Sequence, residues 1–296
     1  MMSPHSLSIL VSSVLGLGLA IPSYTCIVMG NLDIIRKKGK LSPTDVIFLA
    51  KGIVNILLQF VLSIEGMIHA LCPAFLSGKE LNGFMNTSLY VLMYYNFWLT
   101  FWLSAHYCTS ITNLSYGFFI WLKRIVSNFL SQLLFLTAIG MFIVRVPGSL
   151  AVNAESTQPS ENITEDSGKM FCEMFSYVVP ANILGAILPF CLSLLCLVLT
   201  SSFLIRHVWR VNNNDSGSTR PNLQAHVTAL RTIFFLLLIS AFFCVSQLDI
   251  FFQNSPTFPT VCWNLQILSP SVEAAVIFQA SNKMRRIILR RFWTRN

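Results

Sequence analysis

Long apolar stretches are the feature that most limits how this 296-residue chain can fold. A helix of about 20 residues crosses the hydrocarbon core of a bilayer, and seven stretches of roughly that length or longer hold few charges: 6–30, 46–71, 84–110, 126–146, 178–205, 227–252 and 261–280. Charged residues make up only 11% of the chain, whereas about 25% is usual in soluble proteins. The sequence therefore predicts an all-α membrane protein in which residues 1–296 form one domain, a seven-transmembrane helix bundle.

Lysine and arginine are concentrated in alternate connections between these stretches. They gather in the first, third and fifth connections and in the tail, whereas acidic residues are most frequent in the fourth. Because cytoplasmic loops carry an excess of lysine and arginine, we expect a multi-pass protein of the plasma membrane with an extracellular N-terminus and a cytoplasmic C-terminus. The first stretch is too long for the core of a signal peptide, so we expect it to remain as the first helix.

The tail at 281–296 combines apolar and basic residues at helical spacing. Met284, Ile287, Ile288 and Phe292 recur every few positions, with arginines between them. This pattern is typical of a short amphipathic helix on the inner membrane surface, where basic side chains meet anionic lipids. The net charge of +8 would favour nucleic acid only if the basic residues shared a face with aromatic platforms. They alternate with apolar stretches instead, so membrane lipids are an expected partner and nucleic acid is not.

The fourth connection, 147–177, is the longest and most polar. Asn162 begins a glycosylation sequence there, on the predicted outer side. Cys72, Cys172 and Cys262 lie near the same face, where oxidation is possible. Of the pairings open to them we favour Cys72 with Cys172, which leaves the third cysteine unpaired. The cysteines and histidines show no metal-like spacing, so we expect no metal site and no cofactor.

A seven-helix bundle suits a receptor, a transporter or an intramembrane enzyme. Many transporters contain paired helices broken by glycine or proline, and we find no such pair. An intramembrane hydrolase needs HExxH, a nucleophile beside a base, or paired aspartates, and the sequence has none of these. We therefore expect that the protein is not an enzyme, and we favour a receptor over a transporter.

Several short motifs occur in an order and at a spacing that resemble one family of receptors. They are KLS at 40–42, NLS at 113–115, WLKRI at 121–125, LPF at 188–190 and PSV at 270–272. Together they are similar to the cytoplasmic loops and the fifth and seventh helices of the vertebrate bitter taste receptors, also called type 2 taste receptors. The chain resembles a diverged member, because Ile53 stands where that family usually has an arginine and Glu273 where it often has a histidine.

The resemblance implies a G-protein-coupled chemosensory receptor that binds small, mostly hydrophobic bitter compounds in the outer half of the bundle. Two functional alternatives remain: the same architecture serving a non-gustatory ligand, and a seven-span transporter. A homo- or hetero-oligomer also remains open. The positions that match the family's agonist pocket are Leu89, Met93, Phe243, Gln247, Trp263 and Gln266. The alternative for each of them is ordinary packing between helices.

Glu65 and His69 add two ionisable groups to the outer half of the second stretch. They lie four residues apart and therefore face the same way on a helix. Ionisable groups inside a membrane are functional candidates because leaving them in lipid is costly. Two roles stay open for Glu65 and His69: contact with the ligand, or hydrogen bonds to each other and to a loop.

The resemblance also implies a coupling surface for a heterotrimeric G protein at the cytoplasmic end. The matching positions are Lys40, His207, His226, Leu230, Arg231 and Lys283. The polar connection between the fifth and sixth stretches contains helix-breaking residues, so it can adapt to a partner.

Lys51 is a charge inside the second apolar stretch. Ser42 and Pro43 are expected to start that helix as N-cap and first residue, which places Lys51 about two turns inside. We expect its ammonium group to reach back to the inner lipid headgroups. The alternative is an ion pair with Glu273, which would make Lys51 part of the receptor's switch.

Overall fold

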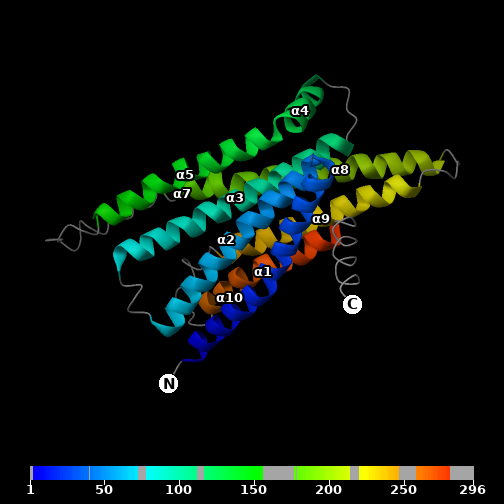
Figure 1. Ribbon diagram of the computed structural model, residues 1–296. Helices are drawn as coiled ribbons and strands as arrows, with labels where there is room; N and C mark the ends of the chain where they lie inside the picture. Colours follow the sequence, from blue (N-terminus) through cyan, green and yellow to red (C-terminus); the bar gives the residue numbers. More distant parts are fainter. Residues whose placement is uncertain are drawn as a thin grey trace, which may run out of the picture.

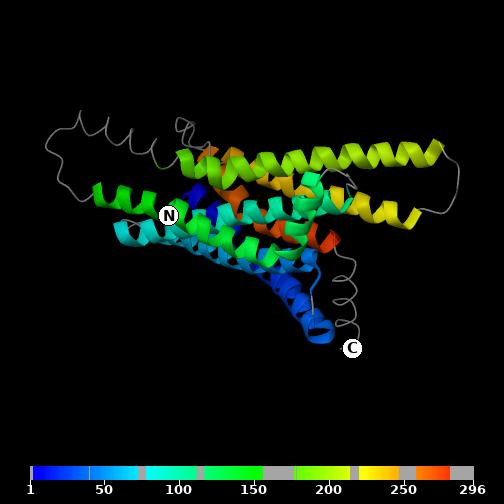
Figure 2. The ribbon, with the colours of Figure 1, turned by 90° about the horizontal axis from the view of Figure 1, so that it is seen from above.

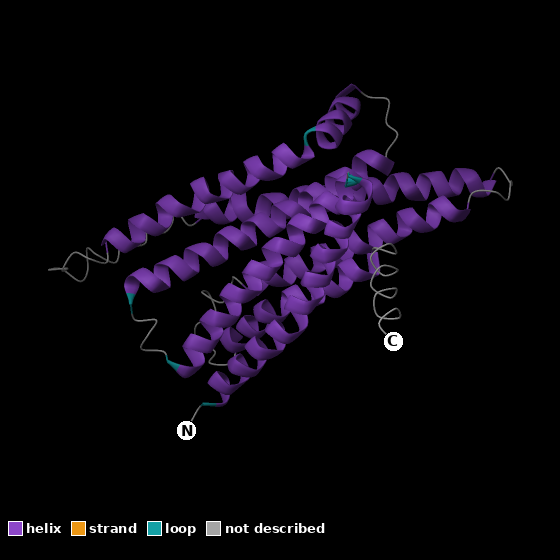
Figure 3. Cartoon of the chain, viewed as in Figure 1, coloured by secondary structure: helices purple, strands orange, loops and turns teal. Residues whose placement is uncertain are grey.

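The structure is a computed structural model that describes residues 3–39, 41–72, 78–111, 117–155, 177, 179–213, 220–246 and 258–280. Within these ranges all the regular structure is helical, as Figures 1 and 3 show. The helices are α1 (Pro4–Lys38), α2 (Pro43–Leu71), α3 (Lys79–Ile111), α4 (Gly117–Asn128), α5 (Leu130–Glu155), α7 (Val179–Asn182), η3 (Ile183–Ile187), α8 (Leu188–Asn213), α9 (Arg220–Ser246) and α10 (Phe258–Ala280). The predicted all-α fold is confirmed.

Over the part of the chain that is described, seven long helices build the bundle: α1, α2, α3, α5, α9, α10 and the continuous run of α7, η3 and α8. Among the described residues, five stretches are long and apolar enough to cross a membrane, namely Pro4–Lys37, Pro43–Leu71, Val179–Arg206, Val227–Ser246 and Phe258–Ala280, and Leu130–Val146 is a shorter apolar helix. Helices also continue past the predicted stretches. Helix α1 runs to Lys38 and α5 to Glu155, so helix ends do not mark the membrane boundaries and the span limits stay predictions.

Helix α3 has 33 residues and stands at the centre of the bundle. It packs against α2, α4, α5, α8 and α9. Its buried face includes the polar residues Thr100 and Ser104. A side chain on a central helix faces other helices rather than lipid, so a polar group there needs only a hydrogen-bonding partner. The polar face of α3 therefore marks the interior where a site can form.

Aromatic side chains tie α3 to its neighbours. Trp102 Nε1 donates to Thr137 Oγ1 of α5 at 3.1 Å, and Trp98 Nε1 donates to the backbone oxygen of Leu184 at 3.2 Å. Leu184 lies in η3, a single wide turn in the helix that α7 and α8 continue. Gly185 in that turn lies directly against the ring of Tyr94. The missing side chain of Gly185 is therefore what lets α3 and η3 approach each other.

Helix ends follow the capping rules. Ser42 has an extended backbone and its side chain accepts a hydrogen bond from the backbone N–H of Asp45, with Pro43 as the first helical residue. The predicted N-cap and first residue of α2 are thus confirmed. Helix α1 ends at Gly39, whose φ of 69° lies in the left-handed region that glycine adopts without strain. These two devices end α1 and start α2.

The connections predicted to be cytoplasmic share one end of the bundle. Figures 1 and 2 agree that the end of α1, helix α4, the end of α8 and the start of α9 lie at the end opposite the N-terminus. The described basic side chains in these segments, all exposed, are Arg36, Lys37, Lys123, Arg124 and Arg206. One end of the molecule is therefore markedly basic.

Candidate ligand site and buried charge network

A buried ion pair joins α2 to α10. Lys51 Nζ lies 2.7 Å from Glu273 Oε1, and the two side chains are 0% and 7% exposed. Burying a single ionised group in a membrane protein is costly unless an opposite charge and hydrogen bonds compensate it. Each of these two charges compensates the other, so the pair fixes α2 against α10.

Polar side chains of α2 and α3 complete a network around the ion pair. Lys51 Nζ donates to Asn96 Oδ1 at 2.7 Å and to Thr100 Oγ1 at 2.9 Å. Asn96 Nδ2 in turn donates to Glu273 Oε2 at 3.0 Å and to Asn55 Oδ1 at 3.2 Å. Asn96 therefore contacts both charges, and the network holds three helices together.

The favoured prediction for Lys51 was wrong. Its side chain does not reach the headgroups but is fully buried in the bundle, because a carboxylate and two polar side chains lie within reach there. The alternative, pairing with Glu273, is confirmed. Asn55, Asn96 and Thr100 were not predicted. The only signal was spacing, since Asn55 lies one turn after Lys51 and Thr100 one turn after Asn96, which places each pair on one helix face.

Three predicted ligand residues meet where α2, α3 and α10 come together. Leu89 is buried in a cluster with Leu62 and Ile267, and Trp263 packs against that cluster. The ring centroids of Trp263 and His69 are 6.3 Å apart, with the rings tilted by 30°. The structure therefore brings Leu89, Trp263 and His69 together from three helices, of which α10 is far from α2 and α3 in the sequence.

Met93 and Phe243 belong to a second cluster, between α3 and α9. The ring of Phe243 meets that of Phe97 edge to face, with centroids 6.0 Å apart, a favourable arrangement for two aromatic rings. Leu89 and Met93 lie one turn apart on α3, so the two clusters are neighbours. Together they form an apolar, aromatic region to which α1, α2, α3, α5, α9, α10 and the segment of α7 and η3 contribute.

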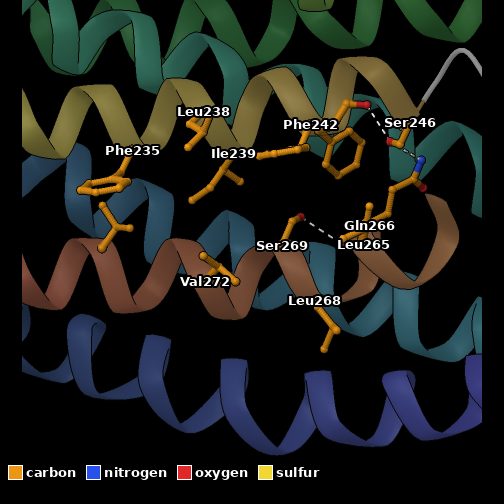
Figure 4. Close-up of a pocket in the computed structure, with 12 residues that line it drawn as sticks. Phe235, Leu238, Ile239, Phe242, Ser246, Leu265, Gln266, Leu268, Ser269 and Val272 are labelled. Carbon is orange, nitrogen blue, oxygen red and sulfur yellow. Dashed lines mark hydrogen bonds between the residues drawn. The ribbon is translucent and has the colours of Figure 1, made fainter. Parts of the chain in front are cut away.

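Gln266 connects α10 to α9. Its Nε2 donates to Ser246 Oγ at 2.8 Å, and Ser246 Oγ donates to the backbone oxygen of Phe243 at 2.7 Å. Figure 4 shows these two hydrogen bonds at one end of a groove between the helices. The groove has a volume of about 340 Å³, and Phe243, Ser246 and Gln266 are among its lining residues. Two predicted ligand residues therefore border one cavity.

Two of the predicted ligand residues each carry a buried polar atom that has no hydrogen-bonding partner among the described residues. These atoms are Trp263 Nε1, a donor, and Glu65 Oε2, an acceptor when the carboxyl group is ionised. Glu65 is half-buried and His69 is exposed, and the structure shows no hydrogen bond between them. The predicted alternative of a Glu65–His69 pair is therefore not seen. Trp263 Nε1 and Glu65 Oε2 stay available for a hydrogen bond to a ligand.

Of the predicted coupling residues, the structure describes the side chains of Leu230 and Arg231. Leu230 is half-buried, and Arg231 is exposed with its Nη2 donating to Gln279 Oε1 of α10 at 2.9 Å. His207 and His226 lie in α8 and α9, but their side chains are not described. Several predicted functional residues lie outside the described ranges, namely Lys40, Asn162, Cys172, Gln247, Lys283 and the tail at 281–296.

The cysteine prediction stays untested. Cys72 is exposed and free in the structure, while its predicted partner Cys172 lies outside the described ranges. Cys262 is buried. Among the described residues, no group of three or more metal-ligating side chains gathers in one place.

A bundle of seven long helices, apolar toward lipid and closed around a polar network at its centre, is the architecture of the seven-transmembrane receptors. Comparison with known proteins makes the assignment specific. A family model described as Taste receptor protein (TAS2R) matches residues 1–296. The chain therefore belongs to the taste receptor type 2 family.

Individual relatives are distant but nearly full-length. Taste receptor type 2 member 31 of Gorilla gorilla gorilla is 28% identical over 280 residues, which covers 88% of this chain and 86% of the relative. Member 7 of Pongo pygmaeus is 24% identical over 293 residues, covering 93% and 91%. Member 43 of Homo sapiens is 27% identical over 271 residues, covering 87% and 84%. The resemblance found in the short motifs thus extends along almost the whole chain.

Proposed function

We propose that this protein is a G-protein-coupled chemosensory receptor for small, mostly hydrophobic bitter compounds. The observation that carries the proposal is the family match over residues 1–296. The structure supports it with an outer-half lining of apolar and aromatic side chains that is contributed by several helices. Membership of a receptor family also indicates binding and signalling rather than catalysis, so we propose no enzymatic activity.

We place the agonist against Leu89, Met93, Phe243, Trp263 and Gln266, with Gln247, Glu65 and His69 at the margin. The unpartnered atoms Trp263 Nε1 and Glu65 Oε2 support this position. A buried polar atom without a partner costs about 1–3 kcal/mol, which a ligand with complementary groups would recover. Ligand pockets are commonly apolar with a few such polar groups to fix orientation.

The basic end of the bundle is the proposed cytoplasmic side, and the N-terminus is then outside the cell. A heterotrimeric G protein would dock at this end, where we place Lys40, His207, His226, Leu230, Arg231 and Lys283. The hydrogen bond from Arg231 to Gln279 joins α9 to α10 there. An agonist that binds one arrangement of these helices more tightly would shift the population toward it. We further propose a plasma-membrane location and glycosylation at Asn162.

Replacing Phe243 by alanine is expected to raise the EC50 of hydrophobic agonists at least about tenfold. Removing a buried phenyl group that touches the ligand forfeits about 1.5–3 kcal/mol of apolar burial, and 1.4 kcal/mol is a factor of ten in affinity. The measurement is a calcium response in cells that express the receptor with a promiscuous G protein, over a panel of hydrophobic bitter compounds.

Phe142→Ala is the matched control, because Phe142 is 56% exposed on α5 and belongs to neither apolar cluster. It should leave the EC50 unchanged at equal surface expression. Equal responses of the two variants would remove Phe243 from the site. Silence of the unmodified receptor across the panel, despite surface expression, would contradict the bitter-compound function, and ligand flux without a G protein would favour a transporter.

A further inference from the structure

The groove between α9 and α10 opens on the side of the bundle that faces lipid. Its edges carry large apolar side chains with much of their surface exposed: Leu238 is 41%, Phe242 58%, Leu265 49% and Val272 52% exposed. Side chains exposed at this depth of two membrane-crossing helices meet acyl chains rather than water. The mouth of the groove is therefore continuous with the interior of the bilayer.

The floor of the groove differs from its mouth. Phe243, Ser246 and Gln266 are 7%, 2% and 8% exposed and close the groove toward the bundle. Gln266 uses its Nε2 on Ser246, and no described residue donates a hydrogen bond to its Oε1. Figure 4 shows Gln266 and Ser246 at one end, with the apolar side chains of Phe235, Leu238 and Val272 along the rest. The groove thus combines a long apolar surface with one amide group at its end.

We propose that this groove is the site where an uncharged agonist enters from the bilayer and binds. The agonist has an apolar body and a single hydroxyl or N–H group, which donates to Gln266 Oε1. The inference rests on the proposed function, and it adds the route of entry and the chemical class of the ligand. Its basis is the continuity of the groove, from lipid-exposed side chains at the mouth to two predicted ligand residues, Phe243 and Gln266, at the floor.

The chemistry of the lining selects this occupant. Ser246 and Ser269 already donate their hydroxyl protons to backbone oxygens, and no charged residue lines the groove. A charged ligand would therefore lose its hydration without gaining a counterion. The volume of about 340 Å³ lies at the small end of the roughly 300–1,000 Å³ that is typical of ligand pockets. A small apolar molecule taken up by the membrane fits both requirements.

Val272→Trp tests the route by filling the mouth. Val261→Trp is the matched control, because Val261 is 53% exposed on the same helix and does not line the groove. We expect Val272→Trp to raise the EC50 of membrane-partitioning agonists at least tenfold in the calcium assay, and Val261→Trp to leave it within twofold. An agonist with a permanent charge does not bind in the groove, so its EC50 should be the same in both variants. A tenfold shift for charged and uncharged agonists alike, or for none, would overturn the proposed route.

A second measurement tests the groove without any agonist. Full-length receptor in lipid vesicles is photolysed with 3-trifluoromethyl-3-phenyldiazirine, a small apolar probe, and the labelled residues are identified by mass spectrometry. We expect saturable labelling at Leu238, Leu265 and Val272 that Val272→Trp abolishes and Val261→Trp does not. Labelling that never saturates and follows only exposure, as at Val261, would show ordinary lipid contact and overturn the site. Saturable labelling of a receptor that stays silent to every agonist would instead contradict the proposed function and leave the groove as an apolar binding site.

Discussion

Lys51→Met should cost the receptor about 3–5 kcal/mol of stability, the range measured when one partner of a buried ion pair is removed. The variant keeps the length and apolar stem of the side chain and removes the ammonium group. Glu273 then loses its opposite charge, 2.7 Å away, while Asn96 Oδ1 and Thr100 Oγ1 lose a donor. The measurements are the melting temperature of the purified full-length receptor and its expression at the cell surface.

The double variant Lys51→Met/Glu273→Met separates the loss of a charge partner from the loss of the side chain. Replacing both members of a buried pair by apolar residues is often nearly neutral. The double variant should therefore recover most of the melting temperature that Lys51→Met loses, while Asn55 and Asn96 keep their mutual contact. Lys37→Met is the control, because Lys37 is exposed at the end of α1 and should change stability by less than about 0.5 kcal/mol.

The same experiment decides between the two roles considered for Lys51. If Lys51→Met had the same melting temperature as the unmodified receptor, and the double variant did not melt higher, Lys51 would not be paired with Glu273 in the receptor. Its side chain would then reach toward the lipid headgroups. Recovery of stability together with altered basal signalling would make the pair part of the switch. The network links α2, α3 and α10, so a change in signalling would arise from the arrangement of those helices.

The overall fold was predictable because it depends on quantities that are local in the sequence. Apolar length predicts helices that cross a membrane, and Ser42 and Pro43 carry a capping signal that is complete within four residues. The ends of the helices were less predictable. Helix α5 continues to Glu155, past the predicted end at 146, because nothing at the membrane surface forces a helix to stop.

The buried network was not predictable in the same way. Lys51, Asn96 and Glu273 are far apart in the sequence, and their contact depends on the rotation of three helices about their own axes. The position of Lys51 within α2 does not decide between the headgroups and Glu273, whereas in the structure the side chain is fully buried. Leu89 and Trp263 were predicted as ligand residues from the family resemblance, and the structure shows only that they share one cluster, so their contact with a ligand stays a prediction.

Gly185→Ala is expected to destabilise the receptor by about 1–3 kcal/mol, the usual cost of overpacking a filled core. A methyl group at this position would overlap the ring of Tyr94. That ring is not free to move away, because Tyr94 is fully buried and its hydroxyl group donates to Asn182 Oδ1 at 2.5 Å. We expect a lower melting temperature, with α3 and η3 forced apart.

Gly140→Ala is the matched control and should change stability in the opposite direction. A methyl group at Gly140, in the interior of α5, meets nothing within 4 Å, so alanine should add up to about 1 kcal/mol through its higher helix propensity. The double variant Gly185→Ala/Tyr94→Leu has a smaller side chain at the partner position. It should lose less stability than the sum of the losses of the two single variants, because the smaller side chain leaves room for the added methyl group. If Gly185→Ala raised the melting temperature as Gly140→Ala does, Tyr94 would not lie against η3, and the contact between α3 and the wide turn would have to be abandoned.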